Sequence, residues 1–379
     1  MGPGPSDVNP RILAAMGQPT IGHLDPAFVD LMDEVKALLQ YAFQTRNELT
    51  LPISAPGSAG MEAAFVNLIE PGDTVIICQN GVFGGRMKEN VTRAGATAVM
   101  VLDDWGTAID LEKAQAAILA NPGARALAFV HAETSTGVQS DAAALCKMAS
   151  AAGMLSIVDA VTSVGGIPVA VDAWGADAAY SGTQKCLSCT PGISPITFSE
   201  RAAERIRTRS VPVQSWFLDM NLIMGYWGAA TKRAYHHTAP INAIYALHES
   251  LVILKEEGLE SSWARHAKNH QALKAGLEAM GLSLPVDPKV RLPQLNLVAV
   301  PDGVDEARVR TELLEHHGLE IGAGLGALAG KAWRIGLMGY GSNPANVRLC
   351  LSALEGALLR QGVKLDAGAA VAAADKAYS

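Results

Sequence analysis

The chain has 379 residues, of which 49% are hydrophobic and 18% are charged. This composition provides for a sizeable core and excludes a largely disordered protein. The length suits one large α/β domain with a smaller one, or two to three average domains. A net charge of −7 without a long basic run argues against nucleic acid or an anionic membrane as the main partner.

The five cysteines, at positions 78, 146, 186, 189 and 350, are scattered along the chain. Their odd number suits a reducing compartment better than a disulfide framework. The opening segment Met1–Ser6 has neither the basic nor the apolar region of a secretory signal, and the apolar runs stop far short of a membrane span. We therefore expect a soluble, cytoplasmic protein.

The chain opens with Gly-Pro-Gly-Pro-Ser, which cannot form a helix interior and predicts an extended arm. A short helix follows from Asn9 to about Gly17, so residues 1–21 are interpreted as an N-terminal arm. Apolar residues then recur at helical spacing from Pro26 to Phe43, which predicts an amphipathic helix.

From residue 49 to about residue 200, predicted strands and helices alternate. The strands are predicted at 49–53, 74–78, 98–102, 126–130, 155–159 and 178–181, and the helices at 58–68, 84–94, 111–119 and 142–152. Nearly all-apolar strands separated by helices indicate a mostly parallel sheet covered on both faces. We assign this sheet to a large domain spanning residues 22–258.

The remainder of the chain mixes helices with strands. An aromatic-rich segment covers 214–227, helices are predicted at 242–257, 259–280, 306–316 and 343–359, and strands at 296–300 and 333–336. This pattern predicts a smaller α+β domain over residues 259–379. Its last part, 361–379, is rich in alanine and predicts a poorly ordered tail.

One lysine stands in an uncharged stretch of sequence. Lys185 follows the apolar run Ala178–Ser181, and no acidic residue lies between Asp177 and Glu200. Desolvation lowers the pKa of a lysine, and the free amine can form a Schiff base with an aldehyde. For a lysine taken alone a surface loop is the better interpretation, so the assignment depends on its partners.

Small or polar residues also follow other predicted strands, at Ala55–Ser58, His131–Thr134 and Asp159. Ligand sites in parallel α/β sheets lie at the carboxyl ends of the strands, which is also where Lys185 is expected. A lysine, an acid at a strand end and a small-residue turn before a helix are the parts that a pyridoxal phosphate (PLP) site requires.

Each partner has a plainer interpretation. The turn Pro56–Ser58 offers free N–H groups that bind phosphate at a helix N-terminus, but Ser58 can equally be an ordinary N-cap. Asp159 can pair with a pyridinium nitrogen and keep it protonated, or can be a turn aspartate. The hydroxyls of Thr134–Gly137 suit a phenolate oxygen or a plain turn.

Three further motifs give weaker indications of a metal or nucleotide site. Cys186–Cys189 fits C-x-x-C, but no second pair and no histidine at ligand spacing accompany it, so we predict no metal site. Gly322–Gly326 with Lys331 matches neither a dinucleotide nor a Walker loop and predicts a flexible loop. His236 and His237 are better explained by hydrogen bonding or packing than by metal binding.

Arg334 places a charge inside an otherwise apolar predicted strand. A buried arginine needs a partner. A substrate carboxylate held by two hydrogen bonds and a structural ion pair are equally good candidates.

Taken together these stretches resemble class V aminotransferases of PLP fold type I, specifically the alanine–glyoxylate (serine–pyruvate) aminotransferase group. The resemblance covers nearly the whole chain and lies in segments 2–6, 22–28, 131–137, 158–166, 180–185, 235–240 and 334–339. It implies an α/β fold in which a mostly parallel sheet of the seven-stranded type forms the large domain, beside a smaller α+β C-terminal domain.

The resemblance implies a role for each matching residue. Lys185 would be the Schiff-base lysine and Asp159 the partner of the pyridine nitrogen. Arg334 would hold the substrate α-carboxylate, with the backbone near Gly4 closing over it. The other implied cofactor contacts are Gly57, Ser58 and Gln184 at the phosphate, Thr134 by the ring hydroxyl, Val161 beneath the ring, and Tyr235 and Thr238 reaching the phosphate of the neighbouring subunit in an obligate homodimer.

Two positions depart from the family pattern. Phe83 stands where relatives often stack a larger aromatic ring on the cofactor, and it can still stack without an indole N–H. Pro56 stands where relatives often have Gly, Ser or Thr, so one phosphate hydrogen bond is in doubt.

The implied reaction is ping-pong transamination from a small amino acid, alanine or serine, to glyoxylate, which becomes glycine. Serine–glyoxylate, ureidoglycine–glyoxylate and pyridoxamine–pyruvate transamination stay open. A cysteine desulfurase would need a mobile reactive cysteine, and Cys350 lies in a predicted helix. A dinucleotide-dependent oxidoreductase lacks its glycine fingerprint, and the presence of Lys185, Asp159 and Arg334 argues against a catalytically silent relative.

Overall fold

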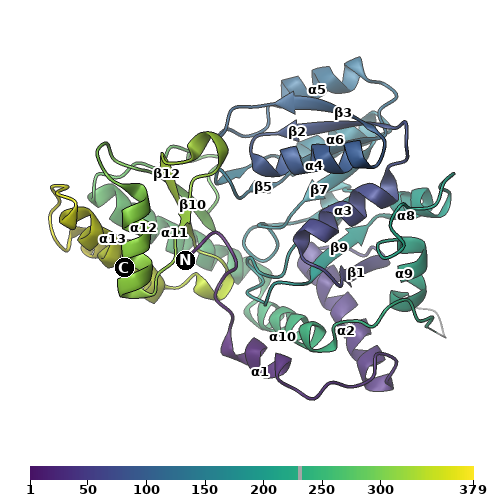
Figure 1. Cartoon of the computed structure of the whole chain (residues 1–379), viewed down its shortest axis with the longest axis horizontal. Helices are drawn as coiled ribbons and strands as arrows, with labels where there is room; N and C mark the ends of the chain where they lie inside the picture. Colours follow the sequence, from purple (N-terminus) through teal and green to yellow (C-terminus); the bar gives the residue numbers. More distant parts are fainter. Residues whose placement is uncertain (229–232) are drawn as a thin grey trace.

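The computed structural model describes residues 1–228 and 233–379, and Figure 1 shows two bodies joined side by side. The larger is built on a seven-stranded sheet with strand order β1-β9-β8-β7-β4-β2-β3. These strands are β1 (Leu49–Ile53), β2 (Thr74–Gln79), β3 (Thr97–Leu102), β4 (Ala126–Val130), β7 (Leu155–Asp159), β8 (Ala178–Tyr180) and β9 (Ser194–Phe198). All neighbours pair in parallel except β9, which is antiparallel to both β1 and β8. The predicted mostly parallel sheet is confirmed.

Helices enclose this sheet, which explains why its strands are apolar. Every residue of β1, β4, β7, β8 and β9 is buried, as expected for strands covered on both faces. The helices of this body are α2 (Pro26–Phe43), α3 (Gly57–Leu68), α4 (Val82–Arg93), α5 (Leu111–Ala120), α6 (Ala142–Ala151), α7 (Val171–Trp174), α8 (Glu200–Arg207), α9 (Met220–Trp227) and α10 (Ile241–Glu257). A short hairpin of β5 (Ala132–Glu133) and β6 (Val138–Gln139) follows β4.

The smaller body has its own antiparallel sheet and its own hydrophobic core. The sheet has the order β10-β12-β11, formed by β10 (Leu295–Ala299), β11 (Gly322–Ala323) and β12 (Ala332–Gly336). Its helices are α11 (Leu259–Ala279), α12 (Glu306–His317), α13 (Pro344–Arg360) and α14 (Ala369–Tyr378), with short 3₁₀ turns at Gly326–Leu328 and Gly339–Gly341. The domain boundary after residue 258 stays a prediction.

The alanine-rich end of the chain differs from the prediction of a poorly ordered tail. It forms α14, whose Ala370 and Ala374 are fully buried. The helix packs against α11 at Gly276, where an added Cβ would lie 2.8 Å from the Ala370 carbonyl. Small residues on both helices permit this close approach, and the Tyr378 hydroxyl fixes the end by donating to Asn269 Oδ1 at 2.6 Å.

The N-terminal arm joins the two bodies (Figure 1). Met1 begins beside β12, where its carbonyl accepts the N–H of Gly336 at 2.7 Å. The arm then crosses to α1 (Pro10–Met16), which packs on α10 through Ile12. Along the part of the chain that the structure describes, no helix combines the length and apolar character needed to cross a membrane. The cytoplasmic location stays a prediction.

Candidate active site

Lys185 lies in the loop after β8 and is buried, with 8% of its surface exposed. Its ammonium donates a hydrogen bond to the Pro3 carbonyl. Ser6 fastens the same loop, since its N–H donates to Gln184 O at 2.8 Å and its hydroxyl to Lys185 O at 2.7 Å. The N-terminal arm therefore lies directly over the lysine.

Gly4 is required for this close approach. A Cβ at this position would lie 2.5 Å from Lys185 Nζ and 2.6 Å from its Cδ. The φ angle of Gly4 is +97°, in the left-handed region that other residues rarely adopt. Gly4 thus contacts the lysine side chain in addition to any contact that it makes to substrate.

The surroundings favour a neutral amine on Lys185. Burial lowers its pKa to about 8, and the positive charge of Arg334 acts in the same direction. A lysine with this pKa is partly deprotonated near neutral pH, as a nucleophile or a general base must be.

Asp159 ends β7 and is also buried. One carboxylate oxygen accepts the N–H of Val161 at 2.9 Å, and the other accepts the hydroxyl of Tyr180 at 3.1 Å. Burial raises the pKa of this carboxyl to about 7, with a contribution from the charge of Glu133. A cation placed against this carboxylate would restore its ionised form.

The N-terminus of α3 is open toward the same region. Pro56 is its N-cap and makes no side-chain capping bond, and Ser58 lies inside the helix, so the alternative of a Ser58 cap is wrong. Gly57 packs on Val161 and on Gly182, at 3.5 and 3.6 Å from its virtual Cβ. Gln184 Oε1 is buried without a partner among the described residues.

Thr134 and Phe83 come from two other strand ends. The buried Thr134 hydroxyl bonds to the hydroxyl of Thr162. Phe83 sits in the first turn of α4, half-buried, with the guanidinium carbon of Arg86 4.8 Å from its ring centre.

Arg334 lies in the middle of β12, paired with Leu297 and Gly322 on either side. Its Nε donates to Ala323 O at 2.8 Å, and one terminal nitrogen donates to Thr134 O at 3.3 Å. Its other N–H groups have no partner within residues 1–228 and 233–379. Burial lowers the pKa of this guanidinium, and a bound anion would offset that effect.

Tyr235 and Thr238 lie on the surface of this chain. Tyr235 is 59% exposed, and its hydroxyl is 3.4 Å from that of Thr238. The neighbouring His236 and His237 bond to each other at 2.8 Å, and His236 stacks on Trp216, which matches the packing interpretation. The described part of the chain contains no group of three or more metal-ligating side chains.

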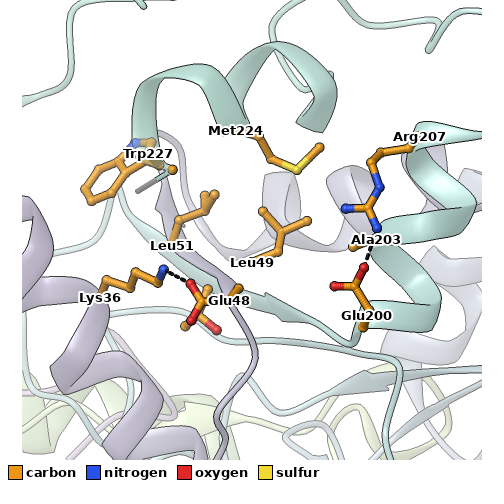
Figure 2. Close-up of a pocket in the computed structure, with 11 residues that line it drawn as sticks. Lys36, Glu48, Leu49, Leu51, Glu200, Ala203, Arg207, Met224 and Trp227 are labelled. Atoms are coloured by element: carbon orange, nitrogen blue, oxygen red, sulfur yellow. Dashed lines mark hydrogen bonds and ion pairs between the residues drawn. The ribbon is translucent and has the colours of Figure 1, made fainter. Parts of the chain in front are cut away.

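The cysteines take no part in this site. Cys186 and Cys189 are buried and unpaired, and burial raises the pKa of both thiols. Cys350 is buried inside α13. The cavity in Figure 2, of about 150 Å³, lies beside β1 and is not this site: apolar side chains such as Leu51 and Trp227 line it between two surface ion pairs.

Sequence reasoning missed three side chains of this site. The Tyr180 hydroxyl donates to Asp159, and the Thr162 hydroxyl bonds to that of Thr134. Glu133, the residue before Thr134, is a fully buried acid. All three lie inside the motifs that carry the family resemblance. The signal for Glu133 was an acid shortly after the apolar strand 126–130, where burial without a partner is costly.

Comparisons with known proteins agree with this geometry. The model of the family "Aminotransferase class-V" matches residues 12–342. The alanine–glyoxylate aminotransferase of Oryctolagus cuniculus is 41% identical over 94% of this chain and 92% of its own. Among solved structures, an alanine–glyoxylate aminotransferase from Nostoc sp. is 47% identical with a TM-score of 0.92, covering 94% of both chains.

A second solved structure matches the entire length. The ureidoglycine–glyoxylate aminotransferase of Bacillus subtilis is 41% identical with a TM-score of 0.97, covering 100% of this chain and 97% of its own. The chain belongs to the class V aminotransferase family. It is a PLP-dependent aminotransferase with the fold of that family.

Proposed function

We propose that this enzyme transfers the amino group of a small amino acid, alanine or serine, to glyoxylate, giving glycine and a 2-oxo acid. The observation that carries the proposal is that Lys185, Asp159 and Arg334, from three separate segments, are all buried, and that the charges of Asp159 and Arg334 both act on the pKa of Lys185. The names of the similar proteins support glyoxylate as the acceptor.

The residues present fit PLP. The N-terminus of α3, which has no side-chain cap, suits a phosphate. The side-chain amide of Gln184, whose Oε1 has no partner among the described residues, can rotate to donate its N–H₂ to the same anion. Gly57 and Ser58 begin that helix, Val161 would lie beneath the ring, and Thr134 would face its hydroxyl. PLP supplies an electron sink for the bond changes at the donor's Cα.

Lys185 acts as the base. Its neutral Nζ takes the proton from the donor's Cα, which its lowered pKa permits near neutral pH. In the cofactor-free chain, the Pro3 carbonyl accepts a hydrogen bond from Nζ. Asp159, fixed by bonds from Val161 and Tyr180, would pair with the ring nitrogen and keep it protonated.

Arg334 orients the substrate. Its Nε is anchored to Ala323 O and one terminal N–H to Thr134 O, which leaves the remaining N–H groups of its two terminal nitrogens for parallel bonds to an α-carboxylate. The arm at Gly4 lies against Lys185 and would close over the substrate. Alanine and serine present the same carboxylate and amine, so these contacts do not rank the two donors.

We further propose that the active unit is a homodimer in which Tyr235 and Thr238 reach the neighbouring subunit's phosphate. The 59% exposure of Tyr235 supports this, as do the exposed apolar side chains Trp216, Phe217 and Leu222 nearby in the sequence.

Two measurements test the function. The purified protein should show a visible chromophore that borohydride fixes onto Lys185, and Lys185→Ala should lose both this adduct and transamination. With glyoxylate as acceptor, alanine and serine should be compared with ureidoglycine, and pyridoxamine should be tried with pyruvate. Absence of glycine formation from any donor would contradict the proposal, and exclusive use of ureidoglycine would select that alternative.

A further inference from the structure

Glu133 is the acid that no step above employs. It is the last residue of β5, directly before Thr134, and none of its surface is exposed. A buried carboxylate without a task would destabilise the fold, so its contacts need an explanation.

The Glu133 carboxylate bonds to two segments far apart in sequence. Oε1 accepts the N–H of Ser135 at 2.9 Å and its hydroxyl at 2.7 Å, while Oε2 accepts the N–H of Phe83 at 3.3 Å. The Ser135 hydroxyl in turn accepts the N–H of Val82 at 3.0 Å. Both N–H groups belong to the first turn of α4.

Helix α4 has no cap of its own. Its N-cap residue is Gly81, which offers no side-chain acceptor. The first N–H groups of a helix lack intrahelical partners and attract negative charge. Glu133 and Ser135 therefore supply the missing acceptors from a loop about fifty positions further along the chain.

Gly81 is shaped for this contact. A Cβ there would clash with Cδ of Glu133 and lie 2.5 Å from the Ser135 hydroxyl. By contrast, an added Cβ at Gly85, one turn further along α4, meets only the flexible end of Gln79 at 3.4 Å. The close approach is thus specific to the first turn.

The charge of Glu133 also reaches the two ends of the site. Its charge raises the pKa of Arg334, which burial lowers, and raises the pKa of Asp159 in the same direction as burial. Glu133 is thus a buried neighbour of both Asp159 and Arg334.

We propose that Glu133 is a positioning residue, which ties the first turn of α4, and with it Phe83, to the Thr134 loop so that both flank the cofactor ring in one fixed geometry. This inference rests on the proposed function, which assigns Thr134 to the ring, and on the family resemblance, which implies that Phe83 stacks on it. Glu133 acts through these two residues and not by contact with substrate.

The test measures cofactor binding to the cofactor-free protein. Glu133→Ala should weaken PLP binding by about tenfold and reduce the visible circular dichroism of the bound chromophore, because Phe83 is no longer held. Glu133→Gln keeps the shape but presents an amide N–H₂ to one of the N–H donors, so its effect should be intermediate. Gly81→Ala should resemble Glu133→Ala with the carboxylate still present.

Two matched variants serve as controls. Gly85→Ala adds the same methyl group to the same helix away from the contact and should bind PLP like the parent. Asp110→Ala removes the carboxylate that caps α5 by accepting from Glu112 and Lys113 N–H groups. It should lower stability without changing the dichroism of the chromophore.

The outcomes separate the two proposals. If Glu133→Gln and Gly81→Ala both match the parent in PLP affinity and dichroism, Glu133 has no positioning role, while the proposed function stands as long as borohydride fixes the cofactor on Lys185 of the parent. If the parent takes up no PLP, both proposals are wrong. Should Glu133→Ala not fold, Glu133→Gln and Gly81→Ala still decide.

Discussion

At the scale of single residues, the active-site lysine illustrates the conflict between function and stability. Lys185 is buried with a pKa of about 8, against an ordinary value of 10.5. Holding this ammonium away from water costs the cofactor-free fold on the order of 3 kcal/mol at neutral pH. Natural active sites commonly retain such a cost, because the shifted group is needed for chemistry.

Replacing this lysine should therefore stabilise the cofactor-free protein. We expect Lys185→Met, which keeps the aliphatic stem but loses the bond to Pro3, to raise the thermal midpoint by about 2–4 °C at pH 7. In the parent, the folded state binds fewer protons than the unfolded chain between pH 8 and 10.5. Its stability should accordingly rise with pH through that window, and the gap to the variant should close.

Scanning calorimetry at pH 7 and pH 10 measures both effects. Lys88→Met, at an exposed position on α4, is the control and should show no such pH-dependent gap. A fall in the midpoint of Lys185→Met at neutral pH would show that the ammonium stabilises the fold.

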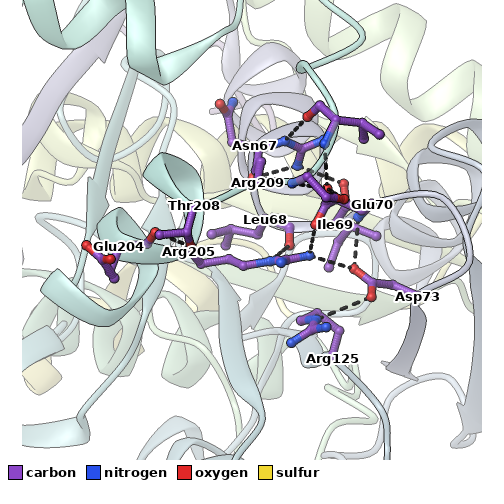
Figure 3. Close-up of polar contacts among 12 residues, drawn as sticks. Asn67, Leu68, Ile69, Glu70, Asp73, Arg125, Glu204, Arg205, Thr208 and Arg209 are labelled. Atoms are coloured by element: carbon purple, nitrogen blue, oxygen red, sulfur yellow. Dashed lines mark hydrogen bonds and ion pairs between the residues drawn. The ribbon is translucent and has the colours of Figure 1, made fainter.

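At the scale of elements, the C-terminal end of α3 is held by a polar network (Figure 3). The Glu70 carboxylate accepts Ser210 N–H at 2.8 Å, its hydroxyl at 2.7 Å and Val211 N–H at 3.0 Å, and pairs with Arg205. Arg209 donates to the carbonyls of Asn67 and Ile69 at 2.8 and 3.0 Å. The segment after α8 is thereby fastened to α3, the helix that would bind the phosphate.

Glu70→Gln should destabilise the protein in a pH-dependent way. Burial raises the pKa of Glu70, but hydrogen bonds from Ser210 and Val211 and the charge of Arg205 outweigh it and lower the pKa to about 2. Because the pKa of Glu70 is lower in the folded state, its ionised carboxylate stabilises the folded protein above pH 4.5, the ordinary pKa. This stabilisation is lost as the pH falls toward 2. We expect a loss of about 3 kcal/mol at pH 7 that shrinks below pH 4.5.

Urea unfolding at pH 7 and pH 3 checks this expectation. Glu204→Gln, which removes an exposed partner of Arg207, should change stability by less than about 1 kcal/mol at either pH. Equal losses for Glu70→Gln at both pH values would mean that its ionisation does not matter.

Element boundaries followed from local sequence where periodicity was strong. The predicted bounds of α2, β1, β4 and β7 match the structure residue for residue, because caps and apolar runs act over a few residues. β9 was missed, since Ser194-Pro-Ile-Thr-Phe becomes a strand only by pairing between β1 and β8. α14 was missed because alanine has little hydrophobic contrast, and its burial depends on Gly276 of α11.

At the scale of the whole molecule, the proposed dimer can be tested by complementation. One variant carries Lys185→Ala and the other carries Tyr235→Ala with Thr238→Ala, and each alone should be nearly inactive. In a mixed dimer, one site receives both defects and the other receives none. Unfolding and refolding an equal mixture should restore roughly a quarter of the parent sites.

The complementation result distinguishes the two arrangements. No recovery in the mixture, with mixed dimers verified by a tag on one variant, would place Tyr235 and Thr238 in the site of their own chain. Sedimentation of the parent protein gives the oligomeric state independently.

The sequence by itself determined which chemistry is available. Lys185 in an uncharged stretch, Asp159 at a strand end and the turn before α3 are local patterns, and the order of strands and helices places them at one sheet edge. Only the tertiary structure decided what surrounds them: the arm from Pro3 to Ser6 over the lysine, Tyr180 on Asp159 and Glu133 on α4. These contacts join residues far apart in sequence. Burial shifts the pKa values of Lys185 and Asp159, and no local sequence pattern encodes that burial.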